Sequence, residues 1–227
     1  MPKAPPARVA LFDVDGTLVD GHVWRGILAY PALPRYRRWL FYADQLAAVF
    51  GFRLRLIFQA RFRETWVRGL ARVLKGWSAG QLDDLFAWIA DEYLVTRYRA
   101  DVVGVLRTHK EQGGHVVVLV STLFGGAIAR IAARLGADAG LGTALEMRDG
   151  VCTGRIVGES CVGPRKLDAV RAYLRRRAPD LRLEDAAAYA DSISDAPLLD
   201  AVVYPTAVYP DPQLRALAQA RGWPIHP

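Results

Sequence analysis

A chain of 227 residues, 52% of them hydrophobic, is long enough to bury one sizeable core and to leave room for a smaller subdomain. Its two cysteines, Cys152 and Cys161, are too few for a disulfide framework and match no paired-cysteine metal motif, which excludes both kinds of scaffold. The net charge is +7, and residues 21–90 account for all of it, with eleven basic and four acidic side chains; five of the six tryptophans lie there too. This shift in composition predicts domain boundaries near residues 20 and 100.

The N-terminal residues MPKAPPA lead directly into an apolar stretch at residues 9–14. They lack the basic region, the long apolar segment and the small-residue cleavage site of a signal peptide. We therefore expect a cytoplasmic protein.

Short apolar runs along the chain predict the strands of a parallel sheet. Residues 8–14 (RVALFDV) stop at Asp-Gly, and residues 115–120 (HVVVLV) follow a Gly-Gly turn, as expected of buried parallel strands. Residues 186–190 and 202–209 are weaker candidates. Helical spacing of apolar residues at 125–135 and 164–177 separates these runs, and strands alternating with helices predict an α/β fold.

Two further segments have a different character. Residues 147–162 (MRDGVCTGRIVGESCV) consist of short β-prone pieces separated by Asp-Gly and Gly, which predicts a hairpin or flap beside the sheet. Residues 21–98 contain no convincing strand and several helix-like segments. We therefore predict a catalytic core formed by residues 1–20 and 100–227, and an all-helical cap formed by residues 21–99.

The strongest chemical signal is Asp13-Val14-Asp15-Gly16-Thr17, directly after the first predicted strand. Two carboxylates at this spacing can point into the crevice where open α/β sheets bind ligands. One suits the nucleophile of phosphoryl transfer, and the other suits the acid and base that protonates the leaving oxygen and then activates water. An Asp-Gly turn with a local side-chain hydrogen bond is the structural alternative.

Three later features fall at the same expected edge of the sheet. Ser121 follows the second strand, so its hydroxyl and the amide of Thr122 can hold phosphate, and Lys166 at a helix start can offset phosphoryl charge. Asp191 can complete an all-oxygen Mg²⁺ site with Asp13 and the backbone carbonyl of Asp15. Asp195 is expected to orient Asp191 or a metal-bound water.

This ordered set, Asp13/Asp15, Ser121, Lys166 and Asp191/Asp195, resembles the four motifs of the haloacid dehalogenase-like phosphatases. The resemblance covers essentially the whole chain outside the cap, and the position of the helical insertion is similar to that of the phosphoserine-phosphatase-like branch, subfamily IB. It implies a Rossmann-like, doubly wound core and Mg²⁺ as cofactor. It also implies that Asp13 is the nucleophile and a metal ligand, Asp15 the general acid and base, Asp191 a third ligand, and Ser121 and Lys166 the phosphate holders.

The chain departs from that family pattern at two positions. Phosphoserine phosphatases usually carry a glutamate for the substrate's amino group shortly after the first motif; here His22 occupies the approximate place, although Asp20 could substitute. His22 is therefore a candidate substrate-binding residue, with simple packing at the hinge as the equal alternative. Thr122 stands where the family has glycine. The bulkier side chain is expected to narrow the phosphate pocket or to change which backbone amide can bind the phosphate.

The cap is both aromatic and basic. Residues 39–58 (WLFYADQLAAVFGFRLRLIF) are strongly apolar, but Asp44, Arg53 and Arg55 interrupt them, so a transmembrane span is not predicted. The segment can form the small core of the cap, or lie against anionic lipid. We expect a phosphatase acting on a small phosphorylated metabolite and no nucleic-acid partner. The alternatives are a lysophospholipid or lipid-headgroup phosphatase at the membrane surface, and a basic membrane- or nucleic-acid-binding module with a vestigial site.

Overall fold

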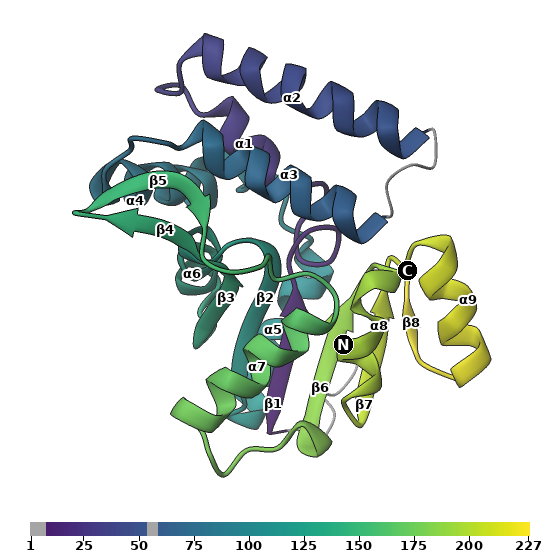
Figure 1. Ribbon diagram of the computed structural model, residues 1–227. Helices are drawn as coiled ribbons and strands as arrows, with labels where there is room; N and C mark the ends of the chain where they lie inside the picture. Colours follow the sequence, from purple (N-terminus) through teal and green to yellow (C-terminus); the bar gives the residue numbers. More distant parts are fainter. Residues whose placement is uncertain (1–7, 54–58) are drawn as a thin grey trace.

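The computed structural model describes the backbone of residues 8–53 and 59–227. It confirms the predicted α/β class, with a parallel sheet, an inserted set of helices and a small antiparallel hairpin (Figure 1). The sheet has six strands in the order β3-β2-β1-β6-β7-β8, all parallel. Its strands are β1 (Val9–Asp13), β2 (Val116–Phe124), β3 (Ala139–Thr143), β6 (Ala186–Ala190), β7 (Tyr204–Val208) and β8 (Ile225–His226).

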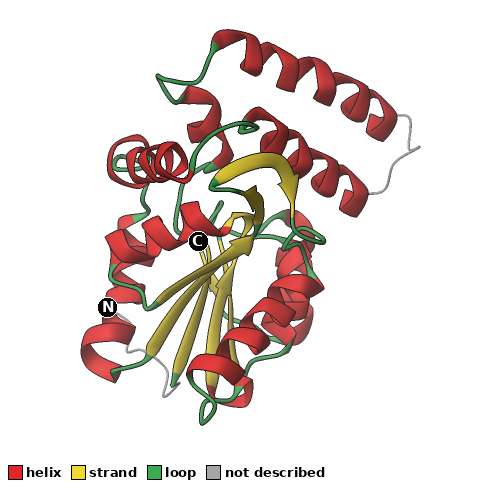
Figure 2. Cartoon of the chain, turned by 60° about the vertical axis from the view of Figure 1, so that its left-hand side comes forward, coloured by secondary structure: helices red, strands yellow, loops and turns green. Residues whose placement is uncertain are grey.

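Helices cover both faces of this sheet, as Figure 2 shows. Side chains of β1 alternate between the faces: Ala10 and Phe12 pack in one apolar cluster, and Val9 and Leu11 pack in the other. The first cluster contains residues of α5 (Ala100–Gly113) and α6 (Gly125–Leu135). The second contains residues of α7 (Pro164–Arg177), α8 (Ala196–Asp200) and α9 (Pro212–Arg221). Two buried faces explain why these strands are apolar throughout.

The structure differs from the sequence prediction mainly in weakly apolar or short elements. The second strand is longer than predicted, since β2 continues from Val116 through Phe124. Strand β3 was not predicted because its sequence, AGLGT, lacks apolar periodicity. Its Gly140 lies against the backbone of Ile128 in α6, where any Cβ atom would collide, so the glycine is required by close helix packing. Helices α5 and α9 and strand β8 were also not predicted.

The inserted helices lie between β1 and α5 in the sequence. They are α1 (Trp24–Ala29), α2 (Arg35–Arg53), α3 (Gln59–Val73), α4 (Ala79–Trp88) and the π-helical turn η1 (Ile89–Tyr93). Their chain entry and exit run side by side, joined by hydrogen bonds from Asp20 N to Arg97 O and from Arg99 N to Leu18 O. At one end the insertion is fastened to the core, because α4 and η1 pack on α6. Phe86 of α4 lies close to Gly126 at the start of α6.

The hairpin consists of β4 (Leu145–Arg148) and β5 (Val151–Ile156), within and just before the predicted flap. It is hydrogen-bonded to the segment between α3 and α4. Gly76 N donates to Cys152 O, and Cys152 N donates to Trp77 O, each at 2.8 Å. Ala79 N donates to Gly150 O. The hairpin and the inserted helices therefore form one packed unit above the sheet (Figure 1).

No helix in residues 8–53 or 59–227 is long and apolar enough to cross a membrane. The apolar segment predicted at 39–58 begins in α2, and its last five residues lie outside the described part of the chain, as does the N-terminal MPKAPPA stretch.

A buried polar cluster lies between α5 and the sheet. His109 Nδ1 is 2.8 Å from His115 Nδ1, and His109 Nε2 is 2.9 Å from the hydroxyl of Tyr189. Burial and the neighbouring His115 lower the pKa of His109 to about 4, from an ordinary value of 6.5. The folded protein therefore holds His109 neutral.

Because of this buried cluster, we predict that the free energy of unfolding falls at acidic pH. Between pH 6.5 and 4 His109 binds a proton in the unfolded chain but not in the folded protein. The contribution of neutral His109 to the free energy of unfolding is therefore present above pH 6.5 and is lost as the pH falls toward 4. We expect the free energy of unfolding to drop by about 2 kcal/mol more between pH 7 and 5 in the wild type than in His109→Gln. Urea unfolding at the two pH values measures this difference. Parallel losses in the two proteins would contradict the prediction.

Candidate active site

A buried lysine joins two aspartates at the carboxyl edge of the sheet. Lys166 Nζ lies 2.6 Å from Asp13 Oδ1 and 2.7 Å from Asp195 Oδ1, and all three side chains are almost fully buried. Asp13 ends β1, Lys166 lies in the first turn of α7, and Asp195 lies in the 3-10 turn η3 (Ile193–Asp195) after β6. Although burial opposes its charge, the two carboxylates raise the pKa of Lys166 above its ordinary value. Lys166 is therefore a fixed cation.

The carboxylates outnumber this one cation. Ligand atoms of Asp13, Asp191 and Asp195 lie within 4.8 Å of one another. Burial, followed by the charges of Asp13 and Asp195, raises the pKa of Asp191 to about 8. Three crowded carboxylates with one lysine are a donor set that fits a hard divalent cation such as Mg²⁺, because such a cation relieves their mutual repulsion.

Asp15 points toward the inserted helices. Its Oδ1 accepts a 2.5 Å hydrogen bond from Val23 N, and its Oδ2 accepts one of 3.2 Å from Ser121 Oγ. Burial raises the pKa of Asp15, against the opposing effects of the Val23 amide and nearby positive groups. The side chain is thus held by two segments, the turn before α1 and strand β2.

Ser121 and Thr122 lie inside β2, whereas the sequence analysis predicted that they follow the strand. The register of β2 with β3 shifts between Val120 and Phe124, so regular pairing is interrupted in the part of the strand that contains Ser121 and Thr122. Ser121 is fully buried, and its Oγ also accepts a hydrogen bond from Leu123 N. Thr122 lines the same chamber, and its carbonyl oxygen accepts a 2.6 Å hydrogen bond from Thr143.

These side chains form the floor of a chamber of about 550 Å³ beneath the inserted helices. The predicted residue His22 is exposed and lines it, so the structure brings every predicted site residue to one place. The roof is formed by side chains that the sequence analysis did not single out, apart from His22. The roof residues are His22, Trp24, Arg25, Arg63, Trp66 and Val67.

Two residues missed by the sequence analysis tie the site together. Buried Thr17 places its Oγ1 3.4 Å from Asp13 Oδ2 and 3.5 Å from Asp191 Oδ1. Its position in the Asp-Val-Asp-Gly-Thr string was the available signal. Asp211 accepts hydrogen bonds from Ile193 N and Leu214 N, and its own amide donates to the carbonyl of Asp191. Asp211 therefore joins the start of α9 to the loop that carries Asp191.

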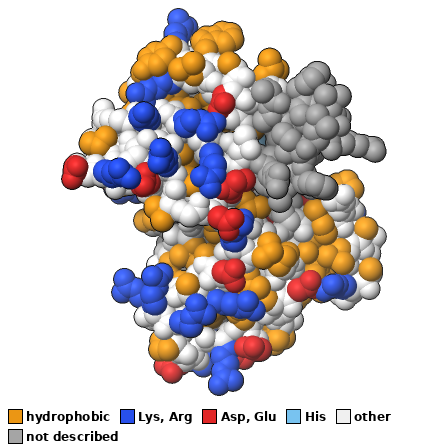
Figure 3. Space-filling view, in the orientation of Figure 1, with side chains coloured by type: hydrophobic (Ala, Val, Ile, Leu, Met, Phe, Trp, Pro, Cys, Tyr) orange, Lys and Arg blue, Asp and Glu red, His pale blue; other side chains and the backbone are white. Residues whose placement is uncertain are grey.

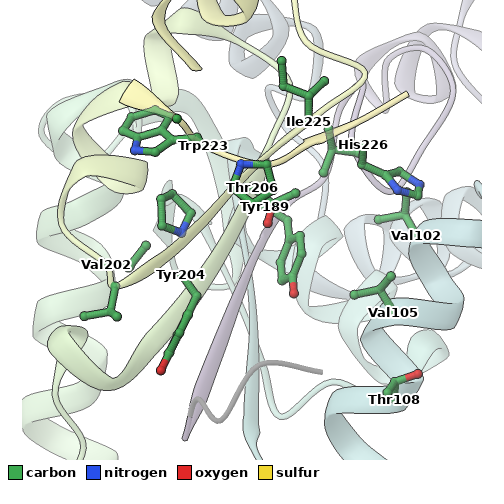
Figure 4. A pocket seen from close by; sticks show the side chains of 15 residues that line it. Val102, Val105, Thr108, Tyr189, Val202, Tyr204, Thr206, Trp223, Ile225 and His226 are labelled. Atoms are coloured by element: carbon green, nitrogen blue, oxygen red, sulfur yellow. The ribbon is translucent and has the colours of Figure 1, made fainter. Parts of the chain in front are cut away.

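A larger cavity, of about 660 Å³, lies elsewhere in the molecule. In Figure 4 the side chains of α5 face those of β6, β7 and β8 across it. Its lining is mostly apolar and contains no carboxylate or lysine among the described residues. We therefore assign the chemistry to the smaller, charged chamber.

Comparison with known proteins agrees with this geometry. The family model of haloacid dehalogenase-like hydrolases matches residues 10–200. The chain is 35% identical to putative hydrolase ML2424 of Mycobacterium leprae, over 99% of this chain and 74% of that one. It is 34% identical to phosphoserine phosphatase SerB1 of Mycobacterium tuberculosis, over 98% and 72%. A solved Bordetella pertussis protein of unknown function matches with a TM-score of 0.76 and 29% identity, over 97% of this chain and 98% of that one.

The chain belongs to the haloacid dehalogenase-like hydrolases. The resemblance inferred from its motifs is confirmed, and the protein is an enzyme of that hydrolase family.

The geometry around Gly16 gives a direct test of the site. Gly16 has φ +83°, and a Cβ atom there would collide with the Asp191 carboxylate. Gly21 has φ +105° but nothing within 4 Å of its Cβ position. Both alanine variants bear backbone strain, but only Gly16→Ala displaces Asp191.

We expect Gly16→Ala to lower kcat/KM roughly 100-fold and to weaken metal binding, while Gly21→Ala changes kcat/KM far less. Steady-state kinetics with a metal titration measure both quantities, and circular dichroism checks the fold. Equal losses in the two variants would show that strain, and not the position of Asp191, limits activity.

Proposed function

We propose that this protein is a Mg²⁺-dependent phosphomonoesterase that hydrolyses a small phosphorylated metabolite through an aspartyl-phosphate on Asp13. The observation that carries the proposal is the pairing of buried Asp13 with Lys166, beside two further carboxylates, in the chamber that Asp15 also lines. Relatives named as hydrolases and as a phosphoserine phosphatase support the same class of reaction.

In the first step an Asp13 carboxylate oxygen attacks phosphorus, and the bond between phosphorus and the leaving oxygen breaks. Asp15, held by Val23 N and Ser121 Oγ, gives its proton to that oxygen, and the alcohol leaves. Asp15 then takes a proton from water as the water attacks phosphorus, which releases phosphate and restores Asp13. Lys166, Ser121 and the Thr122 amide hold the phosphoryl oxygens.

Asp13, Asp191 and the backbone carbonyl of Asp15 would hold the metal ion, with Asp195 supporting from its ion pair with Lys166. When bound, Mg²⁺ supplies charge neutralisation at the phosphoryl group. We further propose that residues 21–99 act as a cap on a catalytic core of residues 1–20 and 100–227. The cytoplasmic location expected from the sequence stays a prediction.

The first experiment compares wild type with Asp13→Asn, a nearly isosteric change that removes the nucleophile. We expect phosphate release from a panel of phosphomonoesters to require Mg²⁺, to stop with a chelator, and to fall by roughly 10³-fold or more in the variant. The panel includes phosphoserine, histidinol phosphate, a sugar phosphate, phosphocholine and lysophosphatidate. Malachite-green detection of phosphate measures it.

Thermal unfolding of both proteins is the control, since the variant must remain folded. Full activity in a folded Asp13→Asn protein would overturn the mechanism. Tight binding to anionic liposomes or nucleic acid with no turnover of any substrate would favour a binding module with a vestigial site.

One surface favours the second candidate, a phosphatase acting on lysophospholipids or lipid headgroups at the membrane. The outward face of α2 is apolar, although the opposite face already packs Phe41 in the core cluster. In Figure 3 hydrophobic and basic side chains gather together over the top of the molecule, where α2 lies. Exposed Trp39 and Leu46 are 75% and 71% accessible, and they are accompanied by Tyr36, Leu40 and Tyr42. An apolar, aromatic stripe bordered by arginines suits an anionic bilayer surface.

Vesicle sedimentation tests this surface. We expect the protein to sediment with phosphatidylserine-rich vesicles but not with phosphatidylcholine vesicles, and Trp39→Ser with Leu46→Ser to weaken that binding several-fold. Val203→Ser, which removes a 54% exposed apolar side chain from the core domain, is the matched control. Binding that is unchanged in the α2 variant would exclude the stripe as the lipid contact.

A further inference from the structure

We propose that Tyr209 is a positioning residue for the reaction, because it ties the hinge of the inserted helices to the loop that leads to Asp211 and so keeps Asp15 aligned with the metal-binding carboxylates. The hinge consists of residues 18–20 and 97–99, where the chain enters and leaves the insertion. The proposal rests on the phosphatase function proposed above. Tyr209 follows β7 directly and lies outside the lining of the chamber.

The backbone of Tyr209 has a conformation that tyrosine rarely adopts. Its φ is +43°, and the only other non-glycine residue with a positive φ within 8–53 and 59–227 is Asp149, in the turn of the hairpin. A bulky residue in this region is strained and persists only where its surroundings hold it. The hydrogen bond from Tyr209 N to His226 O, 2.8 Å long, is one such restraint, and the contacts of the ring and hydroxyl are the others.

The Tyr209 side chain contacts both the hinge and the start of α5. The Arg99 guanidinium lies over its ring, with Cζ 3.9 Å from the ring centroid, and the same guanidinium pairs with Asp20 across the hinge at 3.1 Å. The Tyr209 hydroxyl donates to Asp101 Oδ2 at 2.7 Å, and His226 Nε2 lies at the same distance from that oxygen. Although burial opposes the charge, hydrogen bonds from Tyr209 and His226 lower the pKa of Asp101 to about 2, so the acceptor is ionised at neutral pH.

The stacked arginine is well suited to hold the hinge. Its side chain is 21% exposed, and its Nε is buried without a hydrogen-bond partner in the described part of the chain. A guanidinium over an aromatic face gains more from the contact when water is largely excluded. The ring of Tyr209 therefore stabilises Arg99 in the one position from which Arg99 also reaches Asp20.

The backbone hydrogen bonds of the hinge do not make the same connection. They run from Asp20 N to Arg97 O and from Arg99 N to Leu18 O, so they join the two hinge segments only to each other. The Tyr209 side chain joins this pair of segments to the loop after β7.

Both ends of this connection lead to the chamber. On one side the hinge continues to Val23, whose amide donates to Asp15 Oδ1. On the other side Asp211, two residues after Tyr209, donates its amide to the carbonyl of Asp191 at 2.7 Å. Loss of the Tyr209 contacts would therefore let the segment that holds the acid shift relative to the loop that carries the proposed metal ligand.

Two kinds of ester separate the placement of the acid from overall activity. The p-nitrophenolate group leaves without being protonated, whereas an alkoxide needs the proton of Asp15. In Tyr209→Leu we expect kcat/KM to fall roughly 10- to 100-fold for whichever alkyl phosphate of the panel above is hydrolysed fastest, and less than about threefold for p-nitrophenyl phosphate. Leucine carries comparable backbone strain, so the variant changes the ring and the hydroxyl only. Tyr209→Phe, which keeps the ring beneath Arg99, should retain most of the activity.

A second variant tests the contact from its other side. Arg99→Met should give the same selective loss, and combining it with Tyr209→Leu should add little, because both changes remove one shared contact. Arg99→Met also serves if Tyr209→Leu does not fold. Tyr204→Leu is the matched control, since it removes a half-buried tyrosine from the other end of β7 and should leave the ratio of the two kcat/KM values unchanged.

Amide hydrogen exchange gives a readout that needs no turnover. We expect Tyr209→Leu to speed exchange of the hinge amides of Asp20 and Arg99 by roughly tenfold, while exchange in α7 stays as in the wild type. If no ester is hydrolysed but the hinge amides respond in this way, the phosphatase function fails and the tie between Tyr209 and the hinge stands.

Equal losses for the two kinds of ester in a folded Tyr209→Leu protein would give the residue a purely structural role and overturn the proposal. Unchanged exchange at both hinge amides would overturn it as well, and so would fully additive losses in the double variant.

Discussion

The structure depends on one buried cation held between two carboxylates. Lys166 contacts both Asp13 and Asp195 in an environment almost free of solvent. Such a charge is tolerated only when its partners are in place, and removing one partner from a buried pair typically costs about 3–5 kcal/mol. Because the three residues come from β1, α7 and η3, their contact requires the correct order of strands, the correct start of α7 and the correct turn after β6.

The surrounding polar groups hold the same arrangement from outside. Asp211 caps α9 and is hydrogen-bonded to the loop that carries Asp191, so the packing of α9 helps to fix the position of that loop. Thr17 bridges toward Asp13 and Asp191 from the other side. Gly16 leaves the space that the Asp191 side chain fills. Pre-positioned charge of this kind is what phosphoryl transfer requires, since little else is asked of the protein.

The sequence predicted the parts of the molecule that local patterns determine. Strong apolar runs identified β1 and β2, turn residues between short β-prone pieces indicated the hairpin, and helical spacing gave α6 and α7 with the bounds observed. Strand β3 was missed because its glycines are explained only by close backbone contacts, Gly140 with Ile128 of α6 and Gly142 with the carbonyl of Leu123 in β2. Asp13, Asp15 and Asp191 lie at or just after the ends of β1 and β6, so these residues of the floor could be predicted from the strand pattern.

The roof could not be predicted, because Arg63 is one of eleven basic residues in its region and only tertiary packing distinguishes it. Its bonds to Ser192 and Ser194 join residues far apart in the sequence. No periodicity or short motif carries that information.

The inserted helices are attached to the core unequally. At one end α4 and η1 pack on α6, and the hairpin is bonded to the loop before α4. Near the start of α3 the attachment consists of side-chain hydrogen bonds: Arg63 donates to the hydroxyls of Ser192 and Ser194, and Glu64 accepts from the amide and the hydroxyl of Ser160. The insertion is therefore held by apolar packing at one end and by a few polar side chains at the other. Polar contacts of this kind exchange with water at little cost, so the α3 end is the part of the insertion that can separate from the core without exposing an apolar surface.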